Sequence, residues 1–273
     1  MEPIPQEDLH PLLLNALSAF HEYCEKHSLT YYLSDGTLLG AVRHKGFIPW
    51  DDDVDVSMID AEYDKLIEHA KADPFLDRER RYRFMLPADL PNFYPFLKVV
   101  DTHTRVYEKD ISRVYGIGIW LDVFRLSHCD ADFSKTIEKF YRIQKLKEAN
   151  KLAVCGNFST SRYKALIPFL AMGKGILRMR GKTPVRLSRQ MLAIEQTMPS
   201  YGELLMDITW ADGDHHYFEA KLWEESTLLE FEGRVFMAPA KFKEILTAQY
   251  GDYMTLPPEK DRVRHAYEAY YLK

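Results

Sequence analysis

Four carboxylates lie within five positions of one short segment and could together bind a divalent cation. They are Asp51, Asp52, Asp53 and Asp55, and valines flank the last of them. Carboxylates held this close repel one another and resist ionising together. A divalent cation that prefers hard oxygen ligands relieves that repulsion. The segment therefore indicates metal-assisted chemistry on a nucleotide or a phosphate ester.

The alternation of acids and valines predicts a strand with Asp53 and Asp55 on one face. Residues i and i+2 of a strand point to the same side, about 6.5–7 Å apart. Two carboxylates placed in this way can bind one cation or bracket two. Asp122, a lone acid in the apolar segment 119–124, is the best candidate for a third ligand. A carboxylate there is costly unless it is paired or metal-bound.

Three other interpretations of the acidic segment were compared with a metal site. A solvated acidic turn after Pro49 does not explain why Asp55 continues the pattern into an apolar strand. An EF-hand would place acids at Asp51, Asp53, Asp55 and Glu62, but its required glycine is replaced by Val56, so that interpretation fails. The Asp-x-Asp of a sugar-nucleotide glycosyltransferase stays open.

A glycine turn precedes the acids and could approach phosphate. The order is a strand at 31–34, the turn Gly36-Thr37, a short helix at 37–43 and then the acidic strand. The start of such a helix presents unpaired amides to an anion. Arg43, His44 and Lys45 add positive charge at its end, although cations there also suit the helix dipole without any ligand.

Composition indicates a soluble globular chain that folds as one large domain or two modest ones, since 273 residues with 46% hydrophobic residues can bury a core. Three cysteines without a CxxC pair favour a reducing compartment and argue against a zinc site. The acidic, proline-bearing start does not resemble a signal peptide, and no apolar run reaches the roughly 18–20 residues of a spanning helix. We expect a cytoplasmic protein.

Residues 149–194 contain nine basic residues and no acidic one. Within them, residues 166–180 mix apolar side chains with cations, which suits a helix lying on an anionic membrane. A core helix followed by a solvated basic loop is the equal alternative. No nucleic-acid-binding module is recognisable, so we expect no nucleic-acid partner.

Hydrophobic periodicity predicts an α+β fold, with a mixed sheet flanked by helices and a helical annex. Predicted helices cover 7–27, 37–43, 60–71, 133–151, 163–179, 184–198 and 239–250, and predicted strands cover 31–34, 54–56, 82–85, 96–100 and 119–124. The expected organisation is a catalytic core at 1–130, a basic helical insertion at 131–200, and a segment at 201–273 that completes the core.

The stretch from Gly36 to Asp55 resembles the signature of the LicD family of phosphorylcholine transferases. Further matching pieces are Lys98–Asp101 followed by Thr104, the segment Leu121–Phe124, and the tail Tyr250–Pro258 with Arg262 and His265. One departure is Arg125, which follows Phe124 where the family pattern leads us to expect proline.

The resemblance implies a nucleotidyltransferase-like fold that moves phosphocholine from CDP-choline to a sugar hydroxyl and releases CMP. The acceptor would be a cell-surface glycan or its lipid-linked precursor, of teichoic acid or lipopolysaccharide type, reached at the inner face of the plasma membrane. By the same resemblance Mg²⁺, or Mn²⁺ in its place, is held near Gly36 and Thr37 by Asp53, Asp55 and Asp122.

For the substrates, we expect Asp122 to take the acceptor proton, and Lys98 and Arg43 to contact phosphate oxygens. Choline is a permanent cation without a hydrogen-bond donor, so it requires aromatic faces, for which Trp50 or Trp120 is the candidate. His44, Arg262 and His265 complete the expected substrate-binding set. A transferase that uses another nucleotide donor, and a non-catalytic binding protein with the same fold, are the remaining alternatives.

Overall fold

The computed structural model describes residues 1–156, 166–210, 217–262 and 267–272. Its α-helices are α1 (Gln6–His27), α2 (Asp35–Arg43), α3 (Asp60–Ala72), α4 (Phe133–Val154), α5 (Ile167–Met179), α6 (Pro184–Glu195) and α7 (Phe242–Tyr250). Short 3-10 helices are η1 (Arg113–Tyr115), η3 (Ala220–Leu222) and η4 (Glu259–Asp261). The strands are β1 (Glu2–Pro3), β2 (Tyr32–Leu33), β3 (Asp55–Ile59), β4 (Tyr82–Met85), β5 (Leu97–Asp101), β6 (Thr104–Glu108), β7 (Trp120–His128), β8 (Leu204–Met206), β9 (Tyr217–Glu219), β10 (Ser226–Phe231), β11 (Arg234–Pro239) and β12 (Tyr267–Tyr271).

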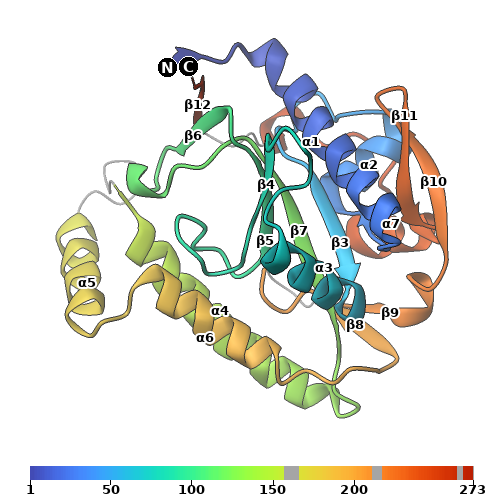
Figure 1. The fold of residues 1–273 in the computed structure, drawn as a ribbon. Helices are drawn as coiled ribbons and strands as arrows, with labels where there is room; N and C mark the ends of the chain where they lie inside the picture. The colour runs from blue at the N-terminus through green and yellow to red at the C-terminus, as the bar shows by residue number, and fades with distance from the viewer. Residues whose placement is uncertain (157–165, 211–216, 263–266, 273) are drawn as a thin grey trace.

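A mixed seven-stranded sheet forms the centre of the molecule (Figure 1). Its main order is β2-β3-β7-β5-β4, and β8 and β9 extend it from β7. Strands β3 and β7 are parallel, and the other described pairs are antiparallel. Helix α1 packs against β5 and β7, and α3 packs against β3 and β7. The main hydrophobic core lies between these layers.

Two smaller β units complete the core. Strand β12 lies between β1 and β6, so segments from both ends of the chain share one sheet, and N and C lie together in Figure 1. Strands β10 and β11 form an antiparallel hairpin that contacts β2 and α2.

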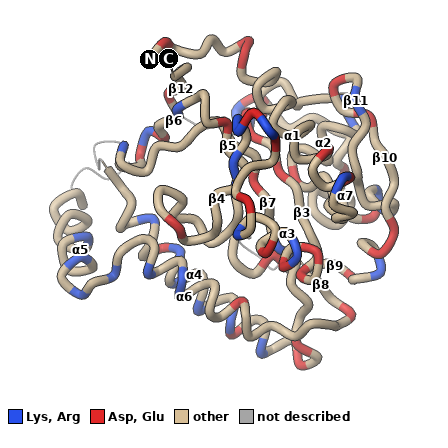
Figure 2. The backbone as a smooth tube through the Cα atoms, in the orientation of Figure 1, with Lys and Arg blue, Asp and Glu red and all other residues tan. Residues whose placement is uncertain are grey.

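Helices α4 and α6 lie side by side as an arm, and α5 packs beside α4 at its edge (Figure 1). Phe140, Ile143 and Met191 of the arm form a second core with Met206 and Ile208. Figure 2 shows basic positions distributed along this arm. None of the described helices is long and apolar enough to cross a membrane.

The predicted α+β class with a mixed sheet and a helical annex is confirmed, but several details of the prediction were wrong. Helix α2 begins at Asp35 instead of Thr37, because Ser34 is its extended N-cap. Strand β3 begins at Asp55, so Asp53 precedes the strand. Strand β7 continues through Arg125, which donates a hydrogen bond of 2.5 Å to Asp64, so no turn follows Phe124. Of the predicted helix 163–179, residues 163–165 lie outside the described residues.

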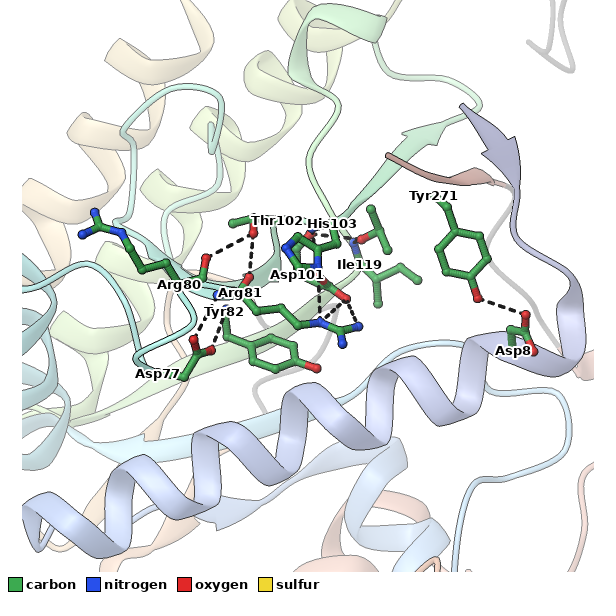
Figure 3. A network of polar contacts seen from close by, with 11 residues as sticks. Asp8, Asp77, Arg80, Arg81, Tyr82, Asp101, Thr102, His103, Ile119 and Tyr271 are labelled. Atoms are coloured by element: carbon green, nitrogen blue, oxygen red, sulfur yellow. Dashed lines mark hydrogen bonds and ion pairs between the residues drawn. The ribbon is translucent and has the colours of Figure 1, made fainter. Parts of the chain in front are cut away.

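Asp101, which belongs to the resemblance, has a structural role (Figure 3). Its buried carboxylate accepts hydrogen bonds from the guanidinium of Arg81, at 2.8 Å from Nη2, and from the backbone amide of His103 at 2.9 Å. Thr104 Oγ1 donates to the Asp101 carbonyl and accepts from the amide of Ile119. These bonds fix the turn between β5 and β6 beside β7.

Candidate active site

A cavity of about 550 Å³ lies against one face of the central sheet. Alternate residues of β7 line it, namely Trp120, Asp122, Phe124 and Leu126, and side chains that alternate along a strand share a face. Asp55 and Ser57 of β3 and Lys98 of β5 continue this floor, and the start of α2, the end of α7 and β12 supply walls. Carboxylates dominate the polar lining: Asp35, Asp52, Asp53, Asp55, Glu108, Asp122 and Asp207.

Asp55 and Asp122 are directly opposite each other on the parallel strands β3 and β7. Neighbouring strands lie about 5 Å apart, so both carboxylates enter the same part of the cavity. Burial, followed by the charges of Asp53, Asp35 and Asp122, raises the pKa of Asp55 well above its usual value. Burial likewise raises the pKa of Asp122 to about 6, against the opposing effect of Lys98. The site therefore concentrates negative charge that its own residues neutralise incompletely.

Lys98 is the only basic side chain among the described residues that line this cavity. Its side chain is 2% exposed, and Nζ donates a hydrogen bond of 2.5 Å to Asp122 Oδ1. The ammonium also lies over the rings of Tyr94, Phe96 and Trp120, at 4.4, 4.9 and 4.6 Å from their centroids. Tyr94 in turn donates to Glu108 at 3.1 Å. The cavity thus holds a cation between aromatic faces and acids, an arrangement that stabilises positive charge.

The start of α2 reaches the cavity through Asp35, which stands two positions before the predicted Thr37. Asp35 has a φ of +48°, in the left-handed region that Asp tolerates better than most residues. Its Oδ1 accepts a hydrogen bond of 2.5 Å from Gln249 of α7, which also lines the cavity. At Gly36 an added Cβ would lie 2.5 Å from Asp51 Oδ2, so only glycine permits this close approach. The turn is therefore held tightly against the acidic segment.

Thr37 does not line the cavity. It is buried within α2, and its Oγ1 accepts the backbone amide of Asp55 at 2.9 Å, which fixes the start of β3. Ser34 is the residue of this turn whose hydroxyl is available to a ligand: it lines the cavity, is 3% exposed, and its Oγ has no hydrogen-bond partner among the described residues. Trp223 Nε1, on another wall of the cavity, also has no hydrogen-bond partner among the residues that the structure describes. Buried unpaired donors are costly, so both groups suit a polar ligand.

The other predicted substrate-binding residues form a separate cluster outside the cavity lining. The guanidinium of Arg262 lies 4.4 Å from the ring centroid of Trp50, and His44 meets the same ring edge-on. Arg43 donates to the carbonyl of Tyr253 at 2.8 Å, which ties α2 to the segment after α7. His265 lies outside the described residues. The structure thus gathers Asp53, Asp55, Lys98, Trp120 and Asp122 in one cavity, and its lining does not include Arg43, His44, Trp50 or Arg262.

Sequence reasoning missed several groups of this cavity, among them Tyr94, Glu108, Asp207 and Trp210. Burial raises the pKa of Asp207 to about 6, although its side chain accepts the amides of Thr209 and Trp210. The lone acid after the apolar segment 204–206 resembles Asp122 in its sequence context and could have been noticed. Tyr94 and Glu108 carry no comparable local signal, because Tyr94 meets Lys98 and Glu108 only once the connection before β5 and the end of β6 have folded together.

The chemistry of the donor set fits a hard divalent cation. Several carboxylates enter one cavity, and burial together with their mutual repulsion raises the pKa of Asp55. Oxygen ligands of this kind are those preferred by Mg²⁺. In the described part of the chain, however, no three or more His, Cys, Asp or Glu side chains are arranged as a set of metal ligands. Metal binding by Asp53, Asp55 and Asp122 stays a prediction.

A mixed sheet with in-register acids on neighbouring strands, beside a glycine turn that opens a helix, defines a protein of the nucleotidyltransferase-like class. Comparison with known proteins agrees. Residues 28–113 match the model of the LicD/FKTN/FKRP family, nucleotidyltransferase domain. Residues 28–113 are therefore similar to the LicD nucleotidyltransferase domain, in agreement with the resemblance that the sequence motifs carry.

One relative extends this similarity to the whole chain, and two others match a short part of it. The chain is 28% identical over 284 aligned residues to the lipopolysaccharide cholinephosphotransferase LicD of Haemophilus influenzae, and the alignment covers 100% of both proteins. Two uncharacterised proteins of Rickettsia prowazekii and Rickettsia typhi are each 51% identical over 39 residues, which is 14% of this chain and 15% and 13% of theirs.

Proposed function

We propose that the acidic cavity transfers phosphocholine from CDP-choline to a sugar hydroxyl of a glycan and releases CMP. The similarity over the full length of a lipopolysaccharide cholinephosphotransferase supports this reaction. The single structural observation that carries the proposal is the juxtaposition of aromatic rings with acids around the ammonium of Lys98. A phosphocholine donor combines a quaternary ammonium with a diphosphate, and so needs both kinds of group close together.

Choline would bind against the rings of Trp120 and Tyr267. Both line the cavity, with ring centroids 6.2 Å apart, and the Tyr267 hydroxyl donates to the Asp52 carbonyl at 3.2 Å. Burial, followed by the negative charges of Asp52 and Asp53, raises the pKa of Tyr267, and the same two charges would stabilise a cation beside this ring. Trp50, the other candidate from the sequence, does not line the cavity.

In the proposed step, an oxygen lone pair of the sugar hydroxyl attacks the phosphorus that bears choline. The bond from that phosphorus to the bridging oxygen breaks, and CMP leaves with the bonding electron pair. The hydroxyl proton passes to Asp122, whose pKa of about 6 leaves it largely ionised yet basic enough to accept a proton near neutral pH. Lys98 holds the Asp122 carboxylate in place through its 2.5 Å hydrogen bond.

Asp53, Asp55 and Asp122 would hold Mg²⁺, or Mn²⁺ in its place. A bound divalent cation would supply charge neutralisation for the donor diphosphate and the departing CMP. Ser34 Oγ and the amides at the start of α2 would donate to phosphate oxygens from the opposite wall.

The decisive experiment incubates the purified protein with CDP-choline, Mg²⁺ and either lipopolysaccharide or a teichoic acid acceptor. We expect CMP release together with incorporation of choline into the glycan, and loss of both on chelation by EDTA. Asp53→Asn should abolish turnover, whereas the control Asp132→Asn, at the exposed N-cap of α4, should retain it. Background CMP release alongside consumption of another nucleotide donor would refute the donor assignment.

We further propose that α5 touches an anionic membrane, at the inner face of the plasma membrane where a lipid-linked acceptor would lie. None of its residues is buried, so the alternative of a core helix is wrong. Phe169, Met172 and Met179 are 64%, 58% and 81% exposed, on a helix that also carries Arg178. Apolar and basic groups on one exposed helix are typical of interfacial binding.

Flotation with liposomes containing phosphatidylglycerol tests this contact. The wild-type protein should float at low salt, and Phe169→Asp should not. An Asp substitution of the exposed Val114, outside the arm, is the matched control and should float. Equal behaviour of the two variants would refute a role for α5.

A further inference from the structure

A second cavity, of about 270 Å³, lies behind the first, between the core and the helical arm. Its walls are mainly apolar and aromatic: Phe93, Tyr94, Ile111, Val154, Met191 and Trp210. The volume is slightly below the roughly 300–1,000 Å³ usual for sites of drug-sized molecules, which suits a single ring. Tyr94 and Trp210 also line the first cavity, and their ring centroids are 5.2 Å apart. One layer of aromatic rings therefore separates the two cavities.

Asn150 of α4 gives this second cavity a polar group without a partner. The residue lines the cavity and is 5% exposed, and its Oδ1 has no hydrogen-bond partner within the described ranges. Its Nδ2 donates to Ser188 Oγ at 2.7 Å, and Ser188 donates its own proton to the carbonyl of Phe93. Because Ser188 can then only accept from Asn150, the chain of bonds assigns the amide orientation. Oδ1 is thus fixed as an acceptor.

A ligand that satisfies Oδ1 must bring a hydrogen-bond donor. Lys147 and Lys151 also line the cavity, and Lys147 Nζ lies 4.3 Å from the ring centroid of Trp210 while donating to its carbonyl at 2.6 Å. Asp110 also lines the cavity, but the two lysines outnumber this one acid, and the net positive charge disfavours a cationic donor such as an ammonium. A neutral hydroxyl is the remaining kind of donor, and its hydrogen bond to the unpaired buried acceptor would stabilise the complex. Aromatic walls, one fixed acceptor and nearby cations together suit a sugar ring.

We propose that the second cavity binds one sugar ring of the acceptor glycan, with a ring hydroxyl donating to Asn150 Oδ1. The identification of the sugar as acceptor rests on the proposed function, since the shared Tyr94–Trp210 wall places the ring beside the donor site. A neighbouring sugar of the same glycan would then enter the first cavity and supply the attacking hydroxyl.

Saturation-transfer NMR on the full chain tests this site with three probes: the methyl glycosides of glucose, galactose and N-acetylgalactosamine. Ile111→Trp replaces a half-buried residue of the cavity lining by a larger ring. The control Val114→Trp adds the same ring three residues further on, where the side chain is 76% exposed and does not line the cavity. We expect at least one glycoside to bind the wild type and Val114→Trp equally, and Ile111→Trp about tenfold more weakly or not at all.

Equal binding by all three proteins, or binding by none, would overturn the proposal. Binding of octyl glucoside but of no methyl glycoside would also overturn it, in favour of an alkyl-chain site. Should Ile111→Trp lower the melting temperature, the smaller Ile111→Phe replaces it. A parallel titration with CDP-choline separates the two hypotheses: glycoside binding without donor binding would retain the second cavity and refute the donor.

Discussion

Replacing Asp55 by asparagine should stabilise the free protein while it abolishes transfer. Asp55 is opposite Asp122 on the neighbouring parallel strand, and burial with nearby charges raises the pKa of both. At the roughly 5 Å between strands and an effective dielectric constant of about 20, two full charges repel by about 3 kcal/mol. The ion pair between Lys98 and Asp122 offsets part of this repulsion, so we expect a gain of about 1–2 kcal/mol, or a rise in melting temperature of roughly 2–8 °C.

Thermal and urea unfolding at pH 8 measure this gain, and CMP release measures activity. The matched control is Asp101→Asn, also a carboxylate at a strand of the central sheet. Asp101 accepts the guanidinium of Arg81 and a backbone amide, so its amide variant should lose about 1–3 kcal/mol. Opposite signs for the two variants are the expected result. If Asp55→Asn destabilises the protein as Asp101→Asn does, the repulsion inferred at the site is refuted.

Three further outcomes are expected. Burial raises the pKa of Asp122 from 3.8 to about 6, so between these pH values the native carboxyl retains a proton that the unfolded one has lost. Its contribution to the free energy of unfolding should therefore fall as pH rises from about 4 to about 6. Urea unfolding of wild type and Asp122→Asn should show a pH-dependent difference in stability that disappears below pH 4. Thr37→Val removes the acceptor of a backbone amide at the start of β3 and should cost about 1–3 kcal/mol in urea unfolding. Gly36→Ala places a Cβ against the Asp51 carboxylate and should lower the rate of CMP release, whereas Gly175→Ala, with open space around it, should not.

Unchanged rates in the Gly36 variant would show that the turn tolerates displacement without loss of the site. A difference between wild type and the Asp122 variant that grows as pH falls below 4 would reverse the sign of the linkage. A Thr37 variant with wild-type stability would mean that water replaces the lost hydroxyl.

Much of the site could be predicted because its acids are local in sequence. Asp53 and Asp55 stand in one short segment, and Asp122 is conspicuous as a lone acid in an apolar strand. The parallel register of β3 and β7 then brings Asp55 and Asp122 together. The periodicity of the long helices α1, α3 and α4 also gave their bounds to within a few residues.

The rest depends on contacts between distant segments. The aromatic surroundings of Lys98 require β7 beside β5, which brings Trp120, and the connection before β5 folded so that Tyr94 and Phe96 meet the ammonium, which no local pattern indicates. Arg43 was expected to contact phosphate and Arg262 to bind substrate, but in the structure the first donates to a backbone carbonyl and the second stacks on Trp50. Strands of two or three residues, such as β8 and β9, have too little alternation to be recognised.

The pairing of β12 with β6 also has a consequence for how the protein is made. Strand β6 ends at Glu108, but its partner β12 begins only at Tyr267. Tyr267 lines the first, acidic cavity. During synthesis the acidic floor of β3 and β7 can form long before that wall leaves the ribosome. The nascent chain therefore passes through a stage in which the carboxylates are gathered but the proposed choline-binding rings are incomplete. Full activity would appear only after the segment that contains β12 has emerged and joined the sheet.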